Sequence, residues 1–310
     1  MEPILTVDGL SISFTQYDGL LHQHRLPVIR DLSLTVAPGQ VVAVLGASGS
    51  GKSLLAHGIL GLLPANSHLE GQILYDGEPL TPARAAALRG REISLVPQGA
   101  GYLDPLMQVG PQLCKGQRTL RDKCRRVLAR YGLGPETERL YPFELSGGMS
   151  RRVMIATAVL DAPRLIVADE PTPGLDRAAA QRILGHFRAL AEEGTAILFI
   201  THDLDLALEA ADRIVVLYAG ETVEEAAAED FSEVSRLRHP YTRALWHAMP
   251  QHGFVPLAGT QPYPGDGTVG CRFAPRCPHA QPACRESIPY RTVRGGRVRC
   301  LYDLPEGGNV

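Results

Sequence analysis

The chain has 310 residues, 45% of them hydrophobic and 21% charged, with a formal net charge of −2. This length accommodates one large domain plus an appendage, and the composition is that of a globular protein. The balanced charge excludes the basic surface that nucleic acids or anionic lipids require, so we expect no nucleic-acid partner. No apolar run approaches the roughly 20 residues of a transmembrane helix. The N-terminus lacks the features of a signal peptide, which predicts a cytoplasmic protein that meets a membrane only through a partner.

Residues 1 to about 40 alternate polar and apolar side chains, as strands do. Turn signals at Asp8-Gly9 and Pro38-Gly39 are expected to separate the early strands. We predict these strands at 4–7, 10–14, 32–36 and 71–77. Residues from about 99 to 160 follow a mostly helical pattern, which predicts a helical subdomain there.

Two short runs of continuous apolar residues, 165–168 and 196–200, are typical of central parallel strands. A helix over about 176–193 separates them, and a further strand is expected at 214–218. Alternating strands and helices predict an α/β core with a mostly parallel sheet. Beyond residue 225 proline and glycine become frequent, so we predict one domain over 1–225 and a separate small module over 226–310.

Residues 46–53, GASGSGKS, fit the pattern G-x-x-x-x-G-K-[ST] between an apolar strand and a helix. This arrangement forms a phosphate-binding loop, because glycines allow backbone N–H groups to converge on phosphate oxygens. Lys52 is expected to reach the β- and γ-phosphates of ATP, and the Ser53 hydroxyl to hold Mg²⁺. The predicted nucleotide-binding residues of the loop are Gly46, Ser48, Gly49, Ser50, Gly51, Lys52 and Ser53. A chance glycine-rich turn is the alternative, and the motifs downstream argue against it.

Polar side chains follow three of the predicted core strands. Asp169 and Glu170 end the strand at 165–168, Gln98 follows a strand at 93–96, and His202 follows the strand ending at 200. Ligands of α/β sheets bind at such carboxyl ends. We expect Asp169 to hold Mg²⁺ and Glu170 to polarise the attacking water. Gln98 is expected to contact both the Mg²⁺ and this water, and His202 to contact the γ-phosphate.

A second anion site is predicted at Ser146, Gly147 and Gly148, which precede a helix over about 150–160. The alternative is plain N-capping of that helix by Ser146. Two phosphate sites far apart in one sequence suggest a dimer in which each chain's Ser-Gly-Gly closes the nucleotide of the other.

In this order the phosphate loop, Gln98, Ser146-Gly147-Gly148, Asp169-Glu170 and His202 resemble the ATP-binding subunit of an ABC transporter, over roughly residues 4–225. The resemblance implies a nucleotide-binding domain with an antiparallel β subdomain and a helical subdomain. It implies a head-to-tail dimer that closes on two ATP molecules, and two transmembrane permease subunits. It also implies an aromatic residue that stacks on adenine.

By position that aromatic residue is Phe14, with Tyr17 second and a core role as the alternative for Phe14. Two departures from the family pattern are expected to alter coupling between the two sites of a dimer without removing a catalytic group. Arg151-Arg152 stands where Gln-Arg is usual, and Pro173-Gly174 where alanine is usual.

The C-terminal region narrows the resemblance. A short helix is expected to begin at His239-Pro240-Tyr241, with the proline in its first turn. This segment, together with the string GCRFAPRCP at 270–278, resembles the C-terminal extension of peptide and nickel importer ATPases. That group imports dipeptides, oligopeptides, nickel or opine metallophores with an extracytoplasmic binding protein. The implied place is the cytoplasmic face of the inner membrane, as a peripheral subunit paired with a second, related ATPase; a homodimer is the alternative.

Within that group the substrate signals disagree: residues 98–105 and 140–144 favour the nickel and metallophore branch, and the cysteine tail favours the peptide branch. A different interpretation of the whole chain is a soluble ABC ATPase without transport, such as an accessory protein of phosphonate breakdown. Such a protein would be expected to lack the cysteine tail.

Four cysteines, Cys271, Cys277, Cys284 and Cys300, suit either a [4Fe–4S] cluster or tetrahedral Zn²⁺. Their spacings are wider than the C-x₂-C pairs of zinc ribbons, so iron–sulfur ranks first, Zn²⁺ second, and free or disulfide-linked thiols third. The resemblance to dipeptide-importer subunits also implies a cluster. Nearby arginines are expected to offset its negative charge. Cys114 and Cys124 are expected to pack in the helical region.

Overall fold

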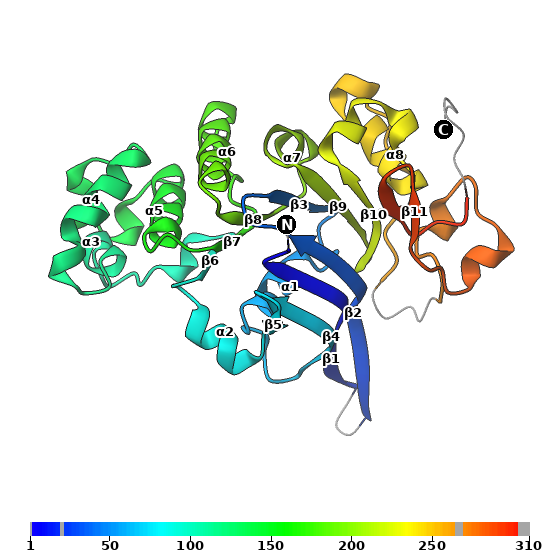
Figure 1. Ribbon diagram of the computed structural model, residues 1–310, viewed down its shortest axis with the longest axis horizontal. Coiled ribbons are helices and arrows are strands. Elements are labelled where there is room, and N and C mark those ends of the chain that lie inside the picture. The colour runs from blue at the N-terminus through cyan, green and yellow to red at the C-terminus, as the bar shows by residue number, and fades with distance from the viewer. Residues whose placement is uncertain (1, 19–21, 264–268, 303–310) are drawn as a thin grey trace.

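The computed structural model in Figure 1 describes residues 2–18, 22–263 and 269–302. The strands of the larger sheet follow the order β11-β12-β10-β9-β3-β8-β7-β6. Its central strands run parallel to one another. They are β6 (Ile93–Val96), β7 (Leu165–Asp169), β8 (Ala196–Thr201), β3 (Val41–Gly46) and β9 (Arg213–Tyr218). Both faces of this sheet are covered, which explains the continuous apolar sequences of its strands.

The smaller sheet is antiparallel, with the order β2-β1-β4-β5. Its strands are β1 (Leu5–Asp18), β2 (His22–Val36), β4 (Ser67–Tyr75) and β5 (Glu78–Pro79). The turn predicted at Asp8-Gly9 is wrong, because β1 continues through it with a shift of register between Val7 and Leu10. Gly9 has a φ of 56° and its N–H donates to Ser33 Oγ at 3.0 Å, so the glycine forms a bulge inside one strand.

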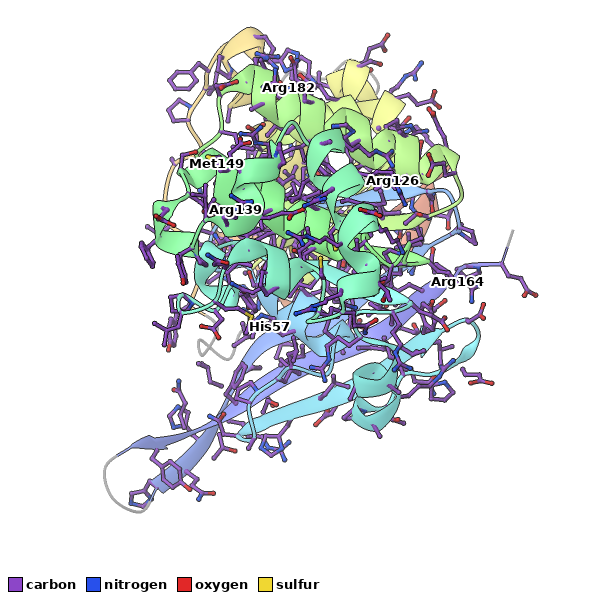
Figure 2. All side chains as sticks on the ribbon, turned by 90° about the vertical axis from the view of Figure 1, so that its left-hand side faces the viewer. His57, Arg126, Arg139, Met149, Arg164 and Arg182 are labelled. Atoms are coloured by element: carbon purple, nitrogen blue, oxygen red, sulfur yellow. The ribbon has the colours of Figure 1, made fainter. Side chains whose placement is uncertain are left out.

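Eight α-helices lie in the described residues. They are α1 (Lys52–Ile59), α2 (Pro82–Leu88), α3 (Val109–Leu113), α4 (Arg121–Arg130), α5 (Gly147–Val159), α6 (Arg177–Glu192), α7 (Leu204–Ala210) and α8 (Pro240–His247). Of these, α3 and α4 pack against α5 and not directly on the larger sheet. Alternate residues of β3 face opposite ways: Val42 and Val44 join the core shared with α1 and the smaller sheet, whereas Val41 and Ala43 join the core shared with α5 and α6. Figure 2 looks onto the helical layer that carries Arg126 of α4 and Met149 of α5. None of the helices in the described ranges is both long and apolar enough to cross a membrane.

The C-terminal segment is built onto the larger sheet. Strand β10 (Glu221–Ala227) crosses the domain boundary suggested at residue 225, and the hairpin of β11 (Arg291–Val293) and β12 (Gly296–Val298) pairs with it. Glu224 of β10 is fully buried and accepts hydrogen bonds from the backbone N–H groups of Arg238 at 2.9 Å and His239 at 2.8 Å.

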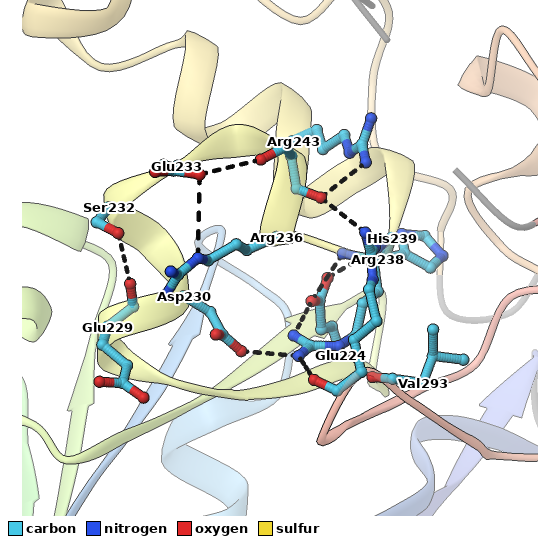
Figure 3. A network of polar contacts seen from close by, with 12 residues as sticks. Glu224, Glu229, Asp230, Ser232, Glu233, Arg236, Arg238, His239, Arg243 and Val293 are labelled. Atoms are coloured by element: carbon cyan, nitrogen blue, oxygen red, sulfur yellow. Dashed lines mark hydrogen bonds and ion pairs between the residues drawn. The ribbon is translucent and has the colours of Figure 1, made fainter. Parts of the chain in front are cut away.

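The side chain of Arg238 completes this anchor. It pairs with Glu224 at 3.3 Å and with Asp230 at 2.8 Å, and donates to the Val293 carbonyl at 2.6 Å (Figure 3). One buried guanidinium therefore ties the start of α8 and the β11–β12 hairpin to β10.

Candidate nucleotide-binding site

The phosphate loop leaves β3 at Gly46 and enters α1 at Gly51. A Cβ on Gly46 would lie 2.8 Å from the Leu217 carbonyl oxygen and 2.7 Å from Ser50 Oγ, so no larger residue fits there. Gly51 has a φ of 93°, and a Cβ there would lie 2.8 Å from a side-chain carbon of Ile29. Both glycines are needed for the conformation of the loop. Ser48 and Gly49 are exposed, so the loop is open to solvent on one side.

Lys52 is buried and spans the loop. Its ammonium donates hydrogen bonds to the carbonyl oxygens of Gly46 at 2.8 Å and Ala47 at 3.0 Å. Burial lowers the pKa of Lys52, and the nearby carboxylates Glu170 and Asp169 raise it again in part. The side chain is thus held beside the loop as a cation that phosphate oxygens can engage.

Asp169, at the end of β7, has the character of a cation ligand. Burial raises the pKa of its carboxyl group, which an interaction with the Ser53 hydroxyl lowers in part. Its Oδ1 atom is buried and has no hydrogen-bond partner among the residues that the structure describes. An orphaned buried oxygen costs free energy that a hard cation recovers, so Asp169 and Ser53 fit Mg²⁺.

Glu170 lies between the other two predicted side chains. Gln98 Nε2 donates to Glu170 Oε2 at 2.9 Å, and His202 Nδ1 lies 3.1 Å from Glu170 Oε1. Glu170 has a φ of 45°, and its N–H bonds the Ile200 carbonyl at 2.9 Å across to β8. The adjacent ends of β6, β7 and β8 thus bring together the three residues expected to act on the attacking water.

One charged residue near the carboxylates was missed as a site residue. Arg151 on α5 is buried and donates to the Pro97 carbonyl at 2.9 Å, directly before Gln98. Burial lowers the pKa of its guanidinium, and Glu170 and Asp169 raise it. The sequence marked Arg151 only as a departure from the family pattern; its position on the buried face of α5 was the available signal.

Ser146 is the N-cap of α5, and its Oγ accepts a hydrogen bond from the Met149 N–H at 3.2 Å. The capping role is therefore present, while Ser146 and Gly147 stay exposed to solvent and Gly148 is half-buried. Helix α5 packs against β6, whereas α1 packs against β7, so the Ser-Gly-Gly segment and the phosphate loop of one chain lie on different elements (Figure 1).

The two aromatic candidates for adenine lie on β1. Phe14 pairs with Leu26 and Ser67 in the smaller sheet and packs partly against the core, in line with its alternative role. Tyr17 is 63% exposed and accepts a hydrogen bond from Gln23 at 2.9 Å.

The four C-terminal cysteines gather in one region. Cys284 and Cys300 are buried, Cys271 and Cys277 are partly exposed, and the Cys271 N–H donates to the Cys284 carbonyl at 2.8 Å. A pocket of about 740 Å³ is lined by Cys271 and Cys284. Burial raises the pKa of Cys271 to about 12 and that of Cys300 to about 11, and each thiol is within electrostatic range of another. As placed, no three His, Cys, Asp or Glu side chains of the described residues converge closely enough to hold one metal ion.

The arginines near these cysteines bond elsewhere. Arg272 donates to the Ala219 carbonyl at 3.0 Å, Arg276 to the Tyr218 hydroxyl at 3.2 Å, and Arg299 pairs with Asp31. In the helical region, Cys114 and Cys124 are buried with their sulfur atoms 2.6 Å apart, in line with the predicted packing role.

A phosphate loop after β3 of a parallel sheet, with Asp-Glu at the end of β7 two strands away and a separate antiparallel sheet, defines the class of ABC-type P-loop ATPases. Comparison with known families agrees: residues 29–173 match the ABC transporter family, and residues 223–284 match the C-terminal region of oligopeptide/dipeptide transporters.

Full-length relatives refine the class. A putative peptide import ATP-binding protein of Brucella abortus is 35% identical, with 98% of this chain and 96% of the relative covered. The oligopeptide transport ATP-binding protein OppD of Haemophilus influenzae is 34% identical over 100% of both chains. The dipeptide transport ATP-binding protein DppD of Bacillus subtilis is 33% identical, covering 95% and 92%. The chain belongs to the ABC transporter ATP-binding proteins of the oligopeptide/dipeptide group, and it is an ATPase.

Solved structures of ATP-binding cassettes share the fold. A dimeric cassette in a post-hydrolysis state, bound to ADP and phosphate, superposes with a TM-score of 0.63 at 26% identity, covering 72% of this chain and 98% of that one. A nucleotide-free cassette from an ABC transporter gives a TM-score of 0.60 at 26% identity, covering 73% and 92%.

Proposed function

We propose that this ATPase powers the uptake of peptides through a membrane permease, as the nucleotide-binding subunit of a binding-protein-dependent importer. The observation that carries this proposal is the similarity along the full chain, C-terminal region included, to proteins named for peptide import. Those names favour peptides over nickel or metallophores as the substrate class, and they give no support to a soluble ATPase of phosphonate breakdown.

The proposed reaction is in-line attack of water on the γ-phosphate of ATP. Glu170 holds and polarises the water. Gln98 and His202 already contact the two carboxylate oxygens of Glu170 and keep that side chain in place. Lys52 exchanges its loop carbonyl partners for phosphate oxygens. Ser53, Asp169 and Gln98 would hold Mg²⁺, which when bound would neutralise charge on the phosphates. Catalysis then rests on positioning and electrostatics. Phe14 is the proposed contact for adenine, with Tyr17 as the second candidate.

A second ATPase subunit completes the proposed assembly. Ser146, Gly147 and Gly148 would close the ATP bound to the partner, since in this chain they lie on a different element from the phosphate loop. The partner is a related chain in a heterodimer, with a homodimer as the alternative.

The permease would dock on exposed apolar side chains of the helical subdomain. Tyr102, Leu106 and Phe143 are 60%, 86% and 74% exposed. Exposed apolar surface is unfavourable in water, and contact with the permease would bury it. The segment that carries Tyr102 and Leu106 is joined to the segment that carries Phe143 by a backbone hydrogen bond, in which the Val109 N–H donates to the Leu140 carbonyl at 2.9 Å. The Tyr102 hydroxyl lies 3.5 Å from His57, which Figure 2 shows on the same face as Met149. In this proposal the subunit is peripheral, at the cytoplasmic face of the membrane, with the extracytoplasmic binding protein as an indirect partner.

For the cysteines we keep the [4Fe–4S] cluster as the first proposal and Zn²⁺ as the second. Support comes from the donor chemistry and the pocket beside Cys271 and Cys284. A single Zn²⁺ needs four sulfurs at about 2.3 Å from one point. A cluster would bind each thiol through a different iron atom, so it would not require the four sulfurs to converge on one point. Iron and zinc analysis of an anaerobic preparation tests this, and a preparation free of both metals would refute both assignments.

The transport proposal is tested by uptake in cells that carry either the wild type or Glu170→Gln. Labelled dipeptides and oligopeptides are measured beside labelled nickel, with and without an opine metallophore. Loss of peptide uptake alone is the expected result. Loss of metal uptake alone would move the chain to the nickel and metallophore branch, and loss of neither would favour the non-transport alternative.

A further inference from the structure

A buried arginine lies on helix α5 without a paired carboxylate. Arg151 is 8% exposed, and its guanidinium donates a hydrogen bond to the Pro97 carbonyl at 2.9 Å. It forms no ion pair with any residue that the structure describes. Burying a cation without a paired carboxylate costs free energy. Departures of this kind from the rules of a stable core are expected at functional sites.

The carbonyl that Arg151 holds belongs to the last buried residue before Gln98. Pro97 directly follows β6 and is buried, whereas Gln98 is exposed. The chain beyond has open surroundings, because a Cβ on Gly99 or Gly101 would meet nothing within 4 Å. Glycines also give the backbone wide conformational freedom. The position of Gln98 therefore depends on the anchor at Pro97.

Gln98 in turn contacts the residue expected to act on water. Its Nε2 donates to Glu170 Oε2 at 2.9 Å, and Glu170 follows β7, the strand that pairs with β6. Hydrogen bonds thus run from Arg151 to Pro97, and from the next residue, Gln98, to Glu170. The carboxylates also act on the guanidinium at longer range: burial lowers the pKa of Arg151, and Glu170 and Asp169 raise it.

The neighbouring arginine has a different set of contacts. Arg152 is half-buried and donates to the carbonyls of Gly148 at 3.2 Å, Tyr131 at 3.2 Å and Gly132 at 3.0 Å, all within the helical subdomain. Consecutive helical residues point about 100° apart, so α5 directs one arginine into its own subdomain and the other toward the end of β6. Only Arg151 of this pair meets the strand that leads to Gln98.

We propose that Arg151 is a positioning residue that holds Gln98 in contact with Glu170 through the Pro97 carbonyl. The inference rests on the proposed function, in which Glu170 polarises the attacking water and Gln98 keeps that carboxylate in place. Both residues act in the chemical step rather than in holding the nucleotide base. Loss of Arg151 should therefore lower kcat and leave KM for ATP nearly unchanged.

The test is ATP hydrolysis by the full-length chain, with kcat expressed per nucleotide site titrated with a fluorescent ATP analogue, so that misfolded protein is not counted. Arg151→Met keeps the length of the side chain and removes the donor, and we expect kcat to fall about 10- to 100-fold, as displacement of a catalytic group does. Arg151→Lys offers a cationic donor to the same carbonyl and should recover most of that loss. The matched control is Arg125→Met, which removes a guanidinium of the helical subdomain that pairs with Glu138 at 2.7 Å. It should leave kcat unchanged.

A double-variant cycle shows whether Arg151 acts through Gln98. Gln98→Ala should itself lower kcat, and adding Arg151→Met to it should change kcat by less than about twofold. The positioning role would be overturned by losses that multiply in the double variant, by wild-type kcat in Arg151→Met, by a lysine variant as slow as the methionine variant, or by an equal loss in Arg125→Met.

A failure of the proposed mechanism would look different. Wild-type kcat in Gln98→Ala would refute the role of Gln98 itself, and the inference about Arg151 with it. A slow Gln98→Ala beside a normal Arg151→Met would refute the inference about Arg151 alone. Phosphate release is measured without permease or peptide, so the result is independent of the transport proposal.

Discussion

Gln98 Nε2 and Glu170 Oε2 are 2.9 Å apart although the two residues are 72 positions apart in the chain. The contact joins the ends of β6 and β7, and His202 at the end of β8 contacts the other oxygen of the same carboxylate. Each Glu170 oxygen therefore has one polar partner from a neighbouring strand. Glu170 is therefore the residue to substitute in a test of the chemistry.

Glu170→Gln should abolish ATP hydrolysis while preserving ATP binding and stabilising the closed dimer. The amide keeps the shape of the side chain but cannot accept a proton, which costs about 10²- to 10⁴-fold in kcat. Phosphate release and nucleotide binding are measured on the same preparation. Glu209→Gln, which removes a surface carboxylate paired with Arg177 at 3.2 Å, is the control and should hydrolyse ATP normally. Wild-type turnover in Glu170→Gln would contradict the assigned role.

Gly46→Ala should damage the phosphate loop. The new methyl group would meet the Leu217 carbonyl at 2.8 Å, and that oxygen belongs to the paired strand β9. Overpacking of this kind costs about 1–3 kcal/mol, so both the free energy of unfolding and the affinity for ADP should fall. In Gly185→Ala the methyl group meets nothing within 4 Å on helix α6. That control should gain about 0.5–1 kcal/mol in stability by chemical denaturation. Equal stability in the two variants would refute the steric argument.

The parts that were predicted from sequence are those whose signal is local. The phosphate loop is one contiguous pattern, and Asp169, Glu170, Gln98 and His202 each follow an apolar strand, so the parallel sheet alone brings them together. The helix predicted over about 176–193 is α6, capped by Asp176 through the Ala179 N–H at 2.7 Å.

What the sequence did not reveal depends on contacts between distant segments. The Asp8-Gly9 pair has the composition of a turn, but pairing with both β2 and β4 keeps β1 extended through it. The proline- and glycine-rich C-terminal segment suggested a separate module, because three-residue strands such as β11 and β12 have no pattern long enough to detect. Tyr241 looked like a residue of a short helix, and only the fold brings its ring against Tyr218 of β9 and Phe273.

Arg238→Met should destabilise the protein strongly. It leaves Glu224, which is fully buried, without the cation that compensates its charge, and such losses cost about 3–5 kcal/mol. Glu224→Gln should cost less, because Arg238 keeps Asp230 at 2.8 Å. The double variant removes the charge together with its partner and should be more stable than Arg238→Met alone. Urea denaturation measures all three, and additive effects in the double variant would show that the pair is not coupled.

His239 should make the protein sensitive to acid. Burial lowers the pKa of its imidazole to about 3 in the folded state, against an ordinary value of 6.5, so the unfolded state binds the proton first as the pH falls. Stability is therefore complete above pH 6.5 and is lost progressively below it, by about 2 kcal/mol at pH 5. Glu224, whose carboxylate meets the His239 backbone, has a raised pKa and contributes with the opposite sign, so a total pH profile cannot isolate the histidine.

The isolating variant is His239→Asn, because asparagine can still cap α8 but does not titrate in this range. Above pH 7 its stability relative to the wild type should be constant. Between pH 6.5 and pH 5 the wild type should lose about 2 kcal/mol relative to the variant, measured as the difference between their urea midpoints at each pH. Glu224 is present in both proteins and cancels. Midpoint curves that stay parallel down to pH 5 would mean that His239 is protonated in the folded state, against its burial among Phe273, Tyr241 and β10.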